Sequence, residues 1–175
     1  NLKNLKKQVI GGYNLSCIGD EKNHSCMFSK SRTSPSDESL ILAYDKLKIK
    51  YREFSFLERG SDERQYNSPG VDLQITSIFR SMYGKYKEYH TSLDDFKFVT
   101  LKGLTGGFKV AREAIKILLK KKFPKNKILC EPKMDKRGLY PTLGQKYSSS
   151  ITRHYMDFLI YSDGRNSLER IAKLI

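Results

Sequence analysis

Apolar positions change their spacing along the chain, and the spacing predicts alternating strands and helices up to about residue 122. Short stretches in which apolar residues alternate with polar or small ones are typical of strands, and we expect strands within residues 11–20, 25–31, 51–58 and 73–83. Stretches with apolar residues three and four apart predict helices over residues 34–48 and 108–122. This alternation favours an α/β fold, with a mixed sheet flanked by helices.

The first predicted helix has a well-defined start. Ser34 is a suitable N-cap, Pro35 fits the first helical position, and acidic residues follow in the first turn, where the helix dipole favours negative charge. The inward face of this helix is expected to carry Leu40, Ile41, Tyr44 and Leu47. For the second helix we expect Phe108, Ala111, Ile115, Leu118 and Leu119 inward, with residues 96–107 forming an extended piece and a turn before it.

Beyond Pro124 the pattern changes to a connector rich in proline and glycine, followed by two short helices. The first helix should place Ile151, Tyr155, Phe158 and Leu159 on one face, and the second should open at Asn166 or Ser167. Two helices joined by a tight turn are typical of the first half of a helix-turn-helix or winged-helix module. The expected organisation is therefore an α/β domain over residues 1–128, a connector over 129–147 and a partial winged helix over 148–175.

The composition adds a strong positive charge, +14, from 33 Lys+Arg against 19 Asp+Glu. Such a balance is found in nucleic-acid-binding proteins. Because the lysines are scattered through the whole chain, we favour a solvated, lysine-rich surface over nucleic-acid binding.

Three cysteines without CxxC spacing argue against a zinc ribbon and against a disulfide framework, which favours a reducing, cytoplasmic setting. No apolar run approaches the roughly 20 residues that would span a membrane, and we expect no membrane partner. The chain does not begin with methionine, and its last residues stop within a helical pattern, so we expect it to be a piece of a longer protein.

Candidate chemistry lies in two segments, ERGSDERQYNSPG (58–70) and YKEYHTSLDDF (86–96). Asp62 follows a predicted strand, and His90 follows the next predicted strand region. Carboxylate oxygen and imidazole nitrogen are suitable zinc ligands, and Asp94 or Asp95 could orient the other ring nitrogen of the histidine. An acid–base pair and a simple loop cap remain alternatives on spacing alone.

These two segments resemble the aminopeptidase-like domain of the di-zinc exopeptidase superfamily, which includes leucyl aminopeptidases and glutamate carboxypeptidases. The resemblance is strongest to a bacterial subset associated with polysaccharide biosynthesis that carries a C-terminal winged helix. GYNLSCIGD, EPKMDKRGLYPTLG and FLIYSDGRNSLERIA also resemble segments of that subset, so the likeness covers nearly the whole chain.

The resemblance implies that Asp62 is a ligand of one zinc ion and His90 a ligand of the other. It also implies hydrolysis of a peptide or amide by a water that two zinc ions activate. The remaining ligands and the glutamate base are expected upstream of Asn1, because nothing in NLKNLKKQVIGG matches them. We therefore expect the isolated chain to lack most of the site and to contribute no catalytic residue of its own.

Substrate contacts are less specified. Arg64 and Arg80 could pair with a substrate carboxylate, and Tyr66 could line a pocket, although exposed arginine and packed tyrosine are the commoner roles. Three hypotheses remain: part of a zinc aminopeptidase-type hydrolase, a nucleic-acid binder that uses the tyrosine- and lysine-rich residues 83–89, and a non-catalytic scaffold. The first is favoured, with a homo-oligomer as a further option.

Overall fold

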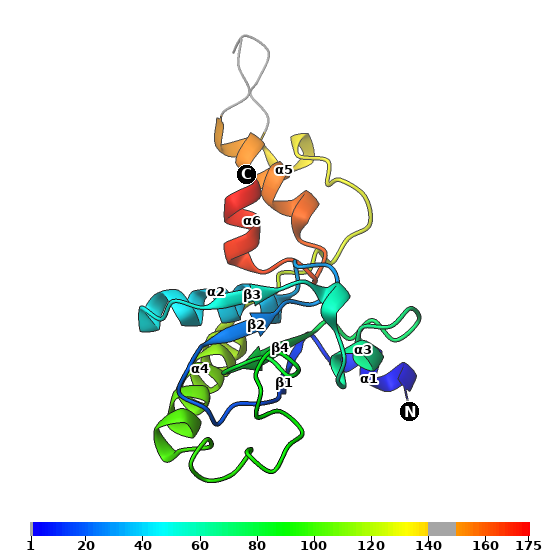
Figure 1. Ribbon diagram of the computed structural model, residues 1–175. Coiled ribbons are helices and arrows are strands. Elements are labelled where there is room, and N and C mark those ends of the chain that lie inside the picture. Colours follow the sequence, from blue (N-terminus) through cyan, green and yellow to red (C-terminus); the bar gives the residue numbers. More distant parts are fainter. Residues whose placement is uncertain (1, 140–149) are drawn as a thin grey trace. The chain divides into compact units, whose positions relative to one another are not determined.

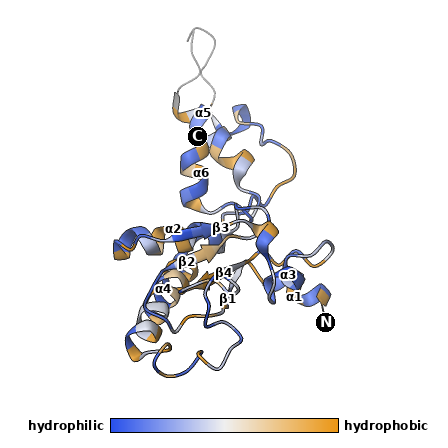
Figure 2. Cartoon of the chain, viewed as in Figure 1, coloured by the Kyte–Doolittle hydropathy of each residue, from blue (hydrophilic) through white to orange (hydrophobic). Residues whose placement is uncertain are grey.

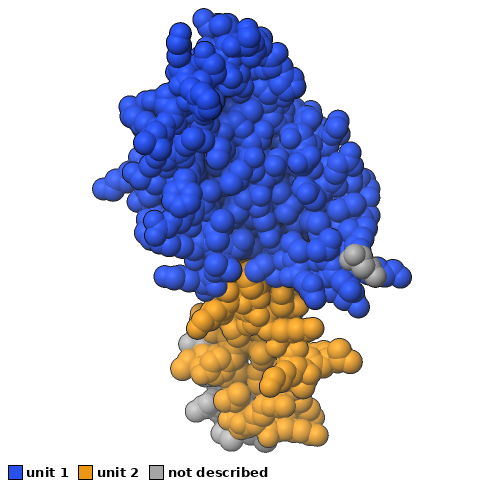
Figure 3. All heavy atoms as spheres, turned by 90° about the horizontal axis from the view of Figure 1, so that it is seen from below, with its two compact units in different colours: residues 1–120 blue, residues 121–175 orange. Residues whose placement is uncertain are grey.

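The computed structural model describes residues 2–139 and 150–175. The chain divides into two compact units, Asn1–Lys120 and Lys121–Ile175 (Figure 3). The boundary between these two units falls between residues 120 and 121, and the division at residues 128 and 148 stays a prediction. Of the expected connector, residues 129–139 belong to the second unit and residues 140–147 lie outside the described residues.

The first unit contains a mixed sheet of four described strands in the order β1-β4-β2-β3 (Figure 1). The strands are β1 (Gly12–Leu15), β2 (Ser25–Met27), β3 (Arg52–Phe54) and β4 (Ile75–Phe79). β1 runs parallel to β4, β2 runs antiparallel to β4, and β3 runs parallel to β2. The predicted α/β class with a mixed sheet is confirmed.

β3 is shorter than the alternating pattern predicts, because a local cap ends it. The Ser55 side chain accepts a hydrogen bond from the Leu57 backbone, and the Glu58 side chain accepts one from the Ser55 backbone. This capping box starts a 3₁₀ helix, Phe56–Glu58, in place of a longer strand.

Two helices cover one face of the sheet. Helix α2 (Pro35–Leu47) begins as predicted, with Ser34 as N-cap in a capping box with Asp37. Helix α4 runs from Leu101 to Lys120, so it begins seven residues before the predicted start at Phe108. The glycines at positions 103, 106 and 107, which suggested a turn, are helical residues that allow a close approach to other parts of the chain.

The buried face of α4 also differs from the expected one. Ala111 and Leu118 are buried as predicted, together with Val110 and Ala114. The other three predicted inward residues, Phe108, Ile115 and Leu119, are 60%, 43% and 79% exposed. The reason is that the glycines and alanines, the small residues, face the packed side of the helix.

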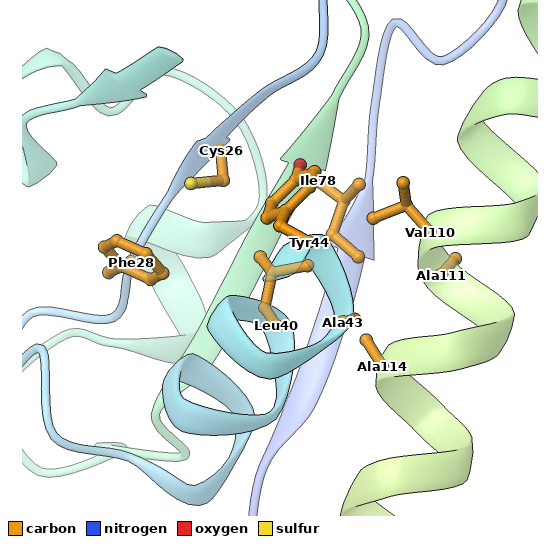
Figure 4. Close-up of a cluster of buried hydrophobic side chains, with 9 residues drawn as sticks. All are labelled: Cys26, Phe28, Leu40, Ala43, Tyr44, Ile78, Val110, Ala111 and Ala114. Atoms are coloured by element: carbon orange, nitrogen blue, oxygen red, sulfur yellow. The ribbon is translucent and has the colours of Figure 1, made fainter. Parts of the chain in front are cut away.

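Hydrophobic residues pack on both faces of the sheet, and β2 and β4 carry clear hydrophobic segments (Figure 2). On the face covered by α2 and α4 the cluster contains Cys26, Phe28, Leu40, Ala43, Tyr44, Ile78, Val110, Ala111 and Ala114 (Figure 4). On the other face it contains Met27, Phe54, Phe79 and Met82. Successive residues of a strand point to opposite faces, which is why Ile78 and Phe79 belong to different clusters.

The rest of the first unit consists of helix α1 (Leu2–Gln8), the one-turn helix α3 (Glu63–Tyr66) and a long loop between β4 and α4. All three cysteines are free, in agreement with the absence of a disulfide framework. Within the described residues, no helix is both long enough and apolar enough to cross a membrane.

The second unit contains a 3₁₀ turn (Asp135–Arg137) and two helices, α5 (Ser150–Tyr161) and α6 (Leu168–Leu174). Ser167 caps α6 by accepting a hydrogen bond from the Arg170 backbone, as predicted. The predicted face of α5 is only partly correct, because Ile151 and Tyr155 are exposed while Phe158 and Leu159 are half-buried.

Candidate functional site

A buried carboxylate organises the turn that precedes Asp62's helix. Glu63 is 1% exposed, and its Oε1 accepts hydrogen bonds from the backbone N–H groups of Gly60 and Ser61, both at 2.9 Å. Its Oε2 accepts a hydrogen bond from the Asn14 side chain on β1 at 2.9 Å. Glu63 therefore fixes the turn containing Asp62 to the edge strand of the sheet.

Tyr83 connects this turn to the loop after β4. Its hydroxyl donates to Glu63 Oε1 and accepts from the Gly60 N–H, each at 2.7 Å. The Tyr83 ring also lies 6.4 Å from the ring of Tyr89, and Tyr89 stacks on His90 with ring centroids 3.9 Å apart. A chain of direct contacts thus links the Asp62 turn to the His90 segment.

Hydrogen bonds keep the Glu63 carboxyl group ionised. Burial alone would raise the pKa of this carboxyl, but donation from Tyr83 and from the backbone of Ser61 and Gly60 outweighs it and lowers the pKa. Burial, together with the neighbouring Glu63 carboxylate, raises the pKa of the Tyr83 hydroxyl. Glu63 is therefore an anion and Tyr83 its neutral donor.

The sheet topology does not place the Asp62 turn and the loop after β4 at neighbouring strand ends. β3 runs antiparallel to β4, so the carboxyl ends of these two strands face opposite ends of the sheet. The segment from Ser55 to Asp62 then returns the chain to Tyr83, just beyond the end of β4. The turn and the loop meet through this return and not through neighbouring strand ends.

Asp62 and His90 are both exposed, and neither side chain makes a hydrogen bond or an ion pair within the part of the chain that the structure describes. Asp62 is the residue before α3, but its side chain does not cap the helix. His90 has a φ of 57°, in the left-handed region that costs energy for a residue with a side chain. The donor atoms of both residues are free to bind a ligand.

The other predicted site residues have different surroundings. Asp95 Oδ1 accepts hydrogen bonds from the backbone of Lys97 and Phe98, which is the turn-capping role that the sequence left open. Asp94 makes no hydrogen bond through its side chain among the described residues, and Arg64 and Tyr66 are exposed on α3. Orientation of His90 by Asp94 or Asp95, and substrate contacts of Arg64 and Tyr66, stay predictions.

Arg80 differs most from the sequence-based expectation. Arginine is more often an exposed residue. Arg80 is only 7% exposed, and its guanidinium contacts the ring of His24. Burial, and the nearby Arg80 charge, lower the pKa of His24 to about 4. His24 is therefore a neutral hydrogen-bond acceptor for Arg80.

A second buried carboxylate holds the loop in which Arg80 lies. Asp20 is 2% exposed, and it accepts hydrogen bonds from the Ser81 N–H at 2.7 Å and from the Ser81 hydroxyl at 2.8 Å. The sequence pattern predicts no role for Asp20, Glu63 or His24. Glu63 could have been noticed as the last acid of a GSDE turn, whereas the positions of buried Asp20 and half-buried His24 depend on contacts with residues more than 50 positions away.

The described residues contain no group of three or more histidine, cysteine, aspartate or glutamate side chains that could hold a metal ion. Asp62 and His90 are suitable in kind for zinc, but two ligands do not make a closed site, which commonly has three or four protein ligands. The zinc site implied by the resemblance is therefore incomplete within these residues.

Two known families match the chain, one for each part. Residues 1–121 match a family described as a domain of unknown function, DUF4910, and residues 122–175 match a winged helix-turn-helix family. The second match agrees with the predicted winged-helix-type module.

Individual relatives agree with these matches. A protein of Clostridium acetobutylicum named for polysaccharide biosynthesis, with an aminopeptidase-like domain, is 32% identical over 98% of this chain and 39% of its own length. A crystal structure from the same organism, named as a peptidase, is 28% identical, with a TM-score of 0.67 over 99% of this chain and 38% of that one. An aminopeptidase from Aneurinibacillus sp. strain AM-1 shares the fold alone, at 12% identity and a TM-score of 0.52 over 65% of this chain and 28% of its own.

Proposed function

This chain belongs to the DUF4910 domain family, and we propose that it forms part of a zinc-dependent, aminopeptidase-like hydrolase of peptide or amide bonds. Its relatives support the peptidase-like character of the domain. The chain spans only 39% of the length of the Clostridium acetobutylicum protein named for polysaccharide biosynthesis, so the proposed activity is that of a longer protein.

The observation that carries the proposal is the contact chain between the two predicted ligand segments. Glu63 and Tyr83 fix the Asp62 turn, and Tyr83 packs toward the Tyr89–His90 stack. A metal site needs ligands that are held in place before the metal arrives, because ordering them on binding costs affinity. In this proposal Asp62 and His90 bind zinc, Glu63 and Tyr83 position Asp62, and residues outside the chain complete the site.

When bound, zinc would polarise the scissile carbonyl and supply an activated water. The groups that this chain contributes have a positioning role: they hold two ligand-bearing loops, and they include no general base. This is consistent with an isolated chain that binds zinc weakly and does not catalyse hydrolysis.

The test is hydrolysis of aminoacyl p-nitroanilides by the full-length protein. Activity should disappear on chelation and return with added zinc. His90→Ala should lower kcat/KM by more than the roughly 10- to 100-fold typical of losing an outer-shell partner of a metal ligand. His154→Ala, a change of the same kind on exposed residue His154 of α5, should leave activity unchanged. Full activity in His90→Ala would refute the role of His90, and absence of hydrolysis of any such substrate would refute the hydrolase proposal.

A second candidate function is nucleic-acid binding by the second unit, which the winged helix-turn-helix family match favours. This function predicts that the logarithm of the affinity for duplex DNA falls linearly with the logarithm of the salt concentration, because phosphate contacts release counterions. The tyrosines of the first unit offer less support, because the rings of Tyr83, Tyr86 and Tyr89 pack on one another. Absence of binding to duplex DNA at low salt would exclude this function.

A further inference from the structure

A hollow of about 610 Å³ lies in the first unit beside the first turns of α4. Its walls come from the segment before β2, from the residue after β4 and from the amino-terminal half of α4. The lining residues are Glu21, His24, Arg80, Leu101, Lys102, Thr105, Gly106 and Lys109. The volume is within the range of about 300–1,000 Å³ that is usual for small-molecule sites.

Arg80 is the unusual member of this lining. It is 93% buried, its Nε has no hydrogen-bond partner, and its Nη1 contacts the neutral ring of His24. No carboxylate pairs with this guanidinium in the described part of the chain. Burying a cation without a counter-charge costs several kcal/mol, so an unpaired buried arginine facing a hollow is expected to have an anionic partner.

The fold makes space specifically for this guanidinium. A Cβ atom on Gly106 would lie 2.2 Å from Arg80 Nη1 and 3.4 Å from His24 Cε1. A larger residue at this position of α4 would therefore displace the Arg80 guanidinium from the place where it lies. Asp20, through its bonds to Ser81, fixes the backbone next to Arg80.

The remaining charges of the hollow are also positive in balance. Lys102 forms an ion pair with Glu21 at 2.8 Å, so these two charges compensate each other. Lys109 has no carboxylate partner among the described residues. Glu21 is also near enough for the Arg80 charge to help lower its pKa. Three cations, Arg80, Lys102 and Lys109, against the one carboxylate of Glu21 leave the lining of the hollow with a net charge of +2.

The direction of α4 adds to this charge. The helix is 20 residues long and starts at the hollow, where Thr100 caps it by accepting the Gly103 N–H at 3.0 Å. The amino-terminal end of a helix carries a partial positive charge that favours anions. The effect is secondary to Arg80, but it has the same sign.

We propose that this hollow binds a small molecule through an oxyanion group, phosphate or carboxylate, with Arg80 as the main ligand and Lys109 as the second. A group with two negative charges matches the net charge of the lining, and the planar guanidinium suits two oxygen atoms of either group. The hollow is larger than the anion itself, which leaves room for the rest of the ligand. None of these residues is a predicted metal ligand, so anion binding can be tested separately from hydrolysis. Arg80 is also the residue that could pair with a substrate carboxylate, and a carboxylate ligand here would therefore rest on the proposed function.

The test is calorimetric titration of metal-free full-length protein with inorganic phosphate and, separately, with succinate at constant ionic strength. Binding of phosphate alone would identify a phosphate site, and stronger binding of succinate a carboxylate site. Arg80→Gln should weaken binding by about tenfold or more, as expected for loss of a charged hydrogen bond. Absence of saturable binding of both anions would overturn the proposal.

Lys109→Gln keeps the proposal testable if Arg80→Gln does not fold, because Lys109 is exposed. It should weaken binding by about two- to fivefold, the usual range for an exposed ionic contact. Lys116→Gln is the matched control, since it removes the same charge from α4 about 10 Å further along the helix axis. Equal effects of the two lysine changes would indicate general charge attraction and would overturn the site. Loss of binding in Asp62→Ala/His90→Ala, with Lys109→Gln unaffected, would also overturn it and would place the anion at the proposed metal site.

Discussion

At the residue scale, individual buried and charged side chains hold the loops of the first unit in place. Glu63 and Asp20 each accept several hydrogen bonds from backbone and side-chain donors, and Arg80 is buried against His24. A buried charge is tolerated where hydrogen bonds or a partner compensate its desolvation. The carboxylates meet this condition within the chain, whereas Arg80 meets it only in part.

The Tyr83 hydroxyl is expected to stabilise the Asp62 turn. Tyr83→Phe keeps the edge-to-face packing on Phe79 but removes the bonds to Glu63 and Gly60. We expect the free energy of unfolding to fall by about 1.5–3 kcal/mol, the usual value for a hydrogen bond to a charged group. Urea denaturation measures this change.

Tyr66→Phe is the control, because Tyr66 is exposed and its hydroxyl makes no hydrogen bond within the described residues. It should change the free energy of unfolding by less than about 0.5 kcal/mol. An equal effect of the two substitutions would show that the Glu63–Tyr83 bond does not hold the turn.

His24 predicts a specific dependence of stability on pH. Its pKa is lowered from 6.5 to about 4 on folding, first by burial and then by the Arg80 charge. The unfolded chain therefore takes up this proton at a higher pH than the folded chain, and stability falls as the pH decreases from 6.5 toward 4. Above pH 6.5 the contribution of His24 is fully present.

The measurement is the free energy of unfolding between pH 6.5 and about 5.5, which stays about one pH unit above the value of 4.5 at which glutamate titrates in the unfolded chain. One proton gives a slope of at most about 1.4 kcal/mol per pH unit. His24→Gln should lose this part of the slope. A slope in His24→Gln equal to that of the unmodified protein would contradict the neutral, half-buried state of His24.

At the scale of elements, the packing of helix α4 depends on glycines, which have no side chain. A Cβ atom on Gly103 would lie 1.9 Å from the Gly19 carbonyl oxygen, and one on Gly107 would lie 2.9 Å from that of Ile18. The first turns of the helix therefore pack directly on the backbone of residues 18–20. This close approach also brings the helix start to the hollow that contains Arg80.

Gly103→Ala should therefore destabilise the protein, although alanine normally favours a helix over glycine by about 1 kcal/mol. The obstructing atom belongs to the backbone and cannot rotate away, so we expect a net loss of about 1–3 kcal/mol in the free energy of unfolding. Lys116→Ala on the exposed side should change it by less than about 0.5 kcal/mol. A stabilising effect of Gly103→Ala in thermal denaturation would contradict the close packing.

Elements with local signals were predictable, and those that depend on distant contacts were not. Ser34, Pro35 and Asp37 specify the start of α2 within four positions, and the structure confirms it. The start of α4 was missed because its glycines disfavour a helix locally, and only packing on residues 18–20 explains them. The early end of β3 was encoded in the SFLE capping box but was outweighed by the alternating pattern.

The same distinction holds for the candidate site. Asp62 and His90 could be proposed from their motifs, and the structure adds that both side chains are exposed and unpaired among the described residues. The link through Glu63 and Tyr83 joins positions 20 residues apart, and no spacing rule predicts it. Arg80 could not be predicted to be buried, because arginine is mostly a surface residue.

At the scale of the whole molecule, ion pairs on several elements of the first unit join some of the 33 Lys+Arg to some of the 19 Asp+Glu, and the net charge stays +14. Surface pairs of this kind contribute little to stability, with a median of about 0–1 kcal/mol. Their distribution over α2, α4, β3 and the loops fits the solvated, lysine-rich surface that the sequence favours. Within the described residues, the hollow beside α4 combines a net positive lining with the buried guanidinium of Arg80.

The zinc content of the full-length protein is the most direct test of the proposed function. Inductively coupled plasma mass spectrometry should find about two zinc ions per chain, as a two-metal hydrolase requires. His90→Ala should lose at least one of them, while His154→Ala should retain both. A full-length protein without bound zinc, or a His90→Ala variant with unchanged zinc content, would contradict a metal site at His90.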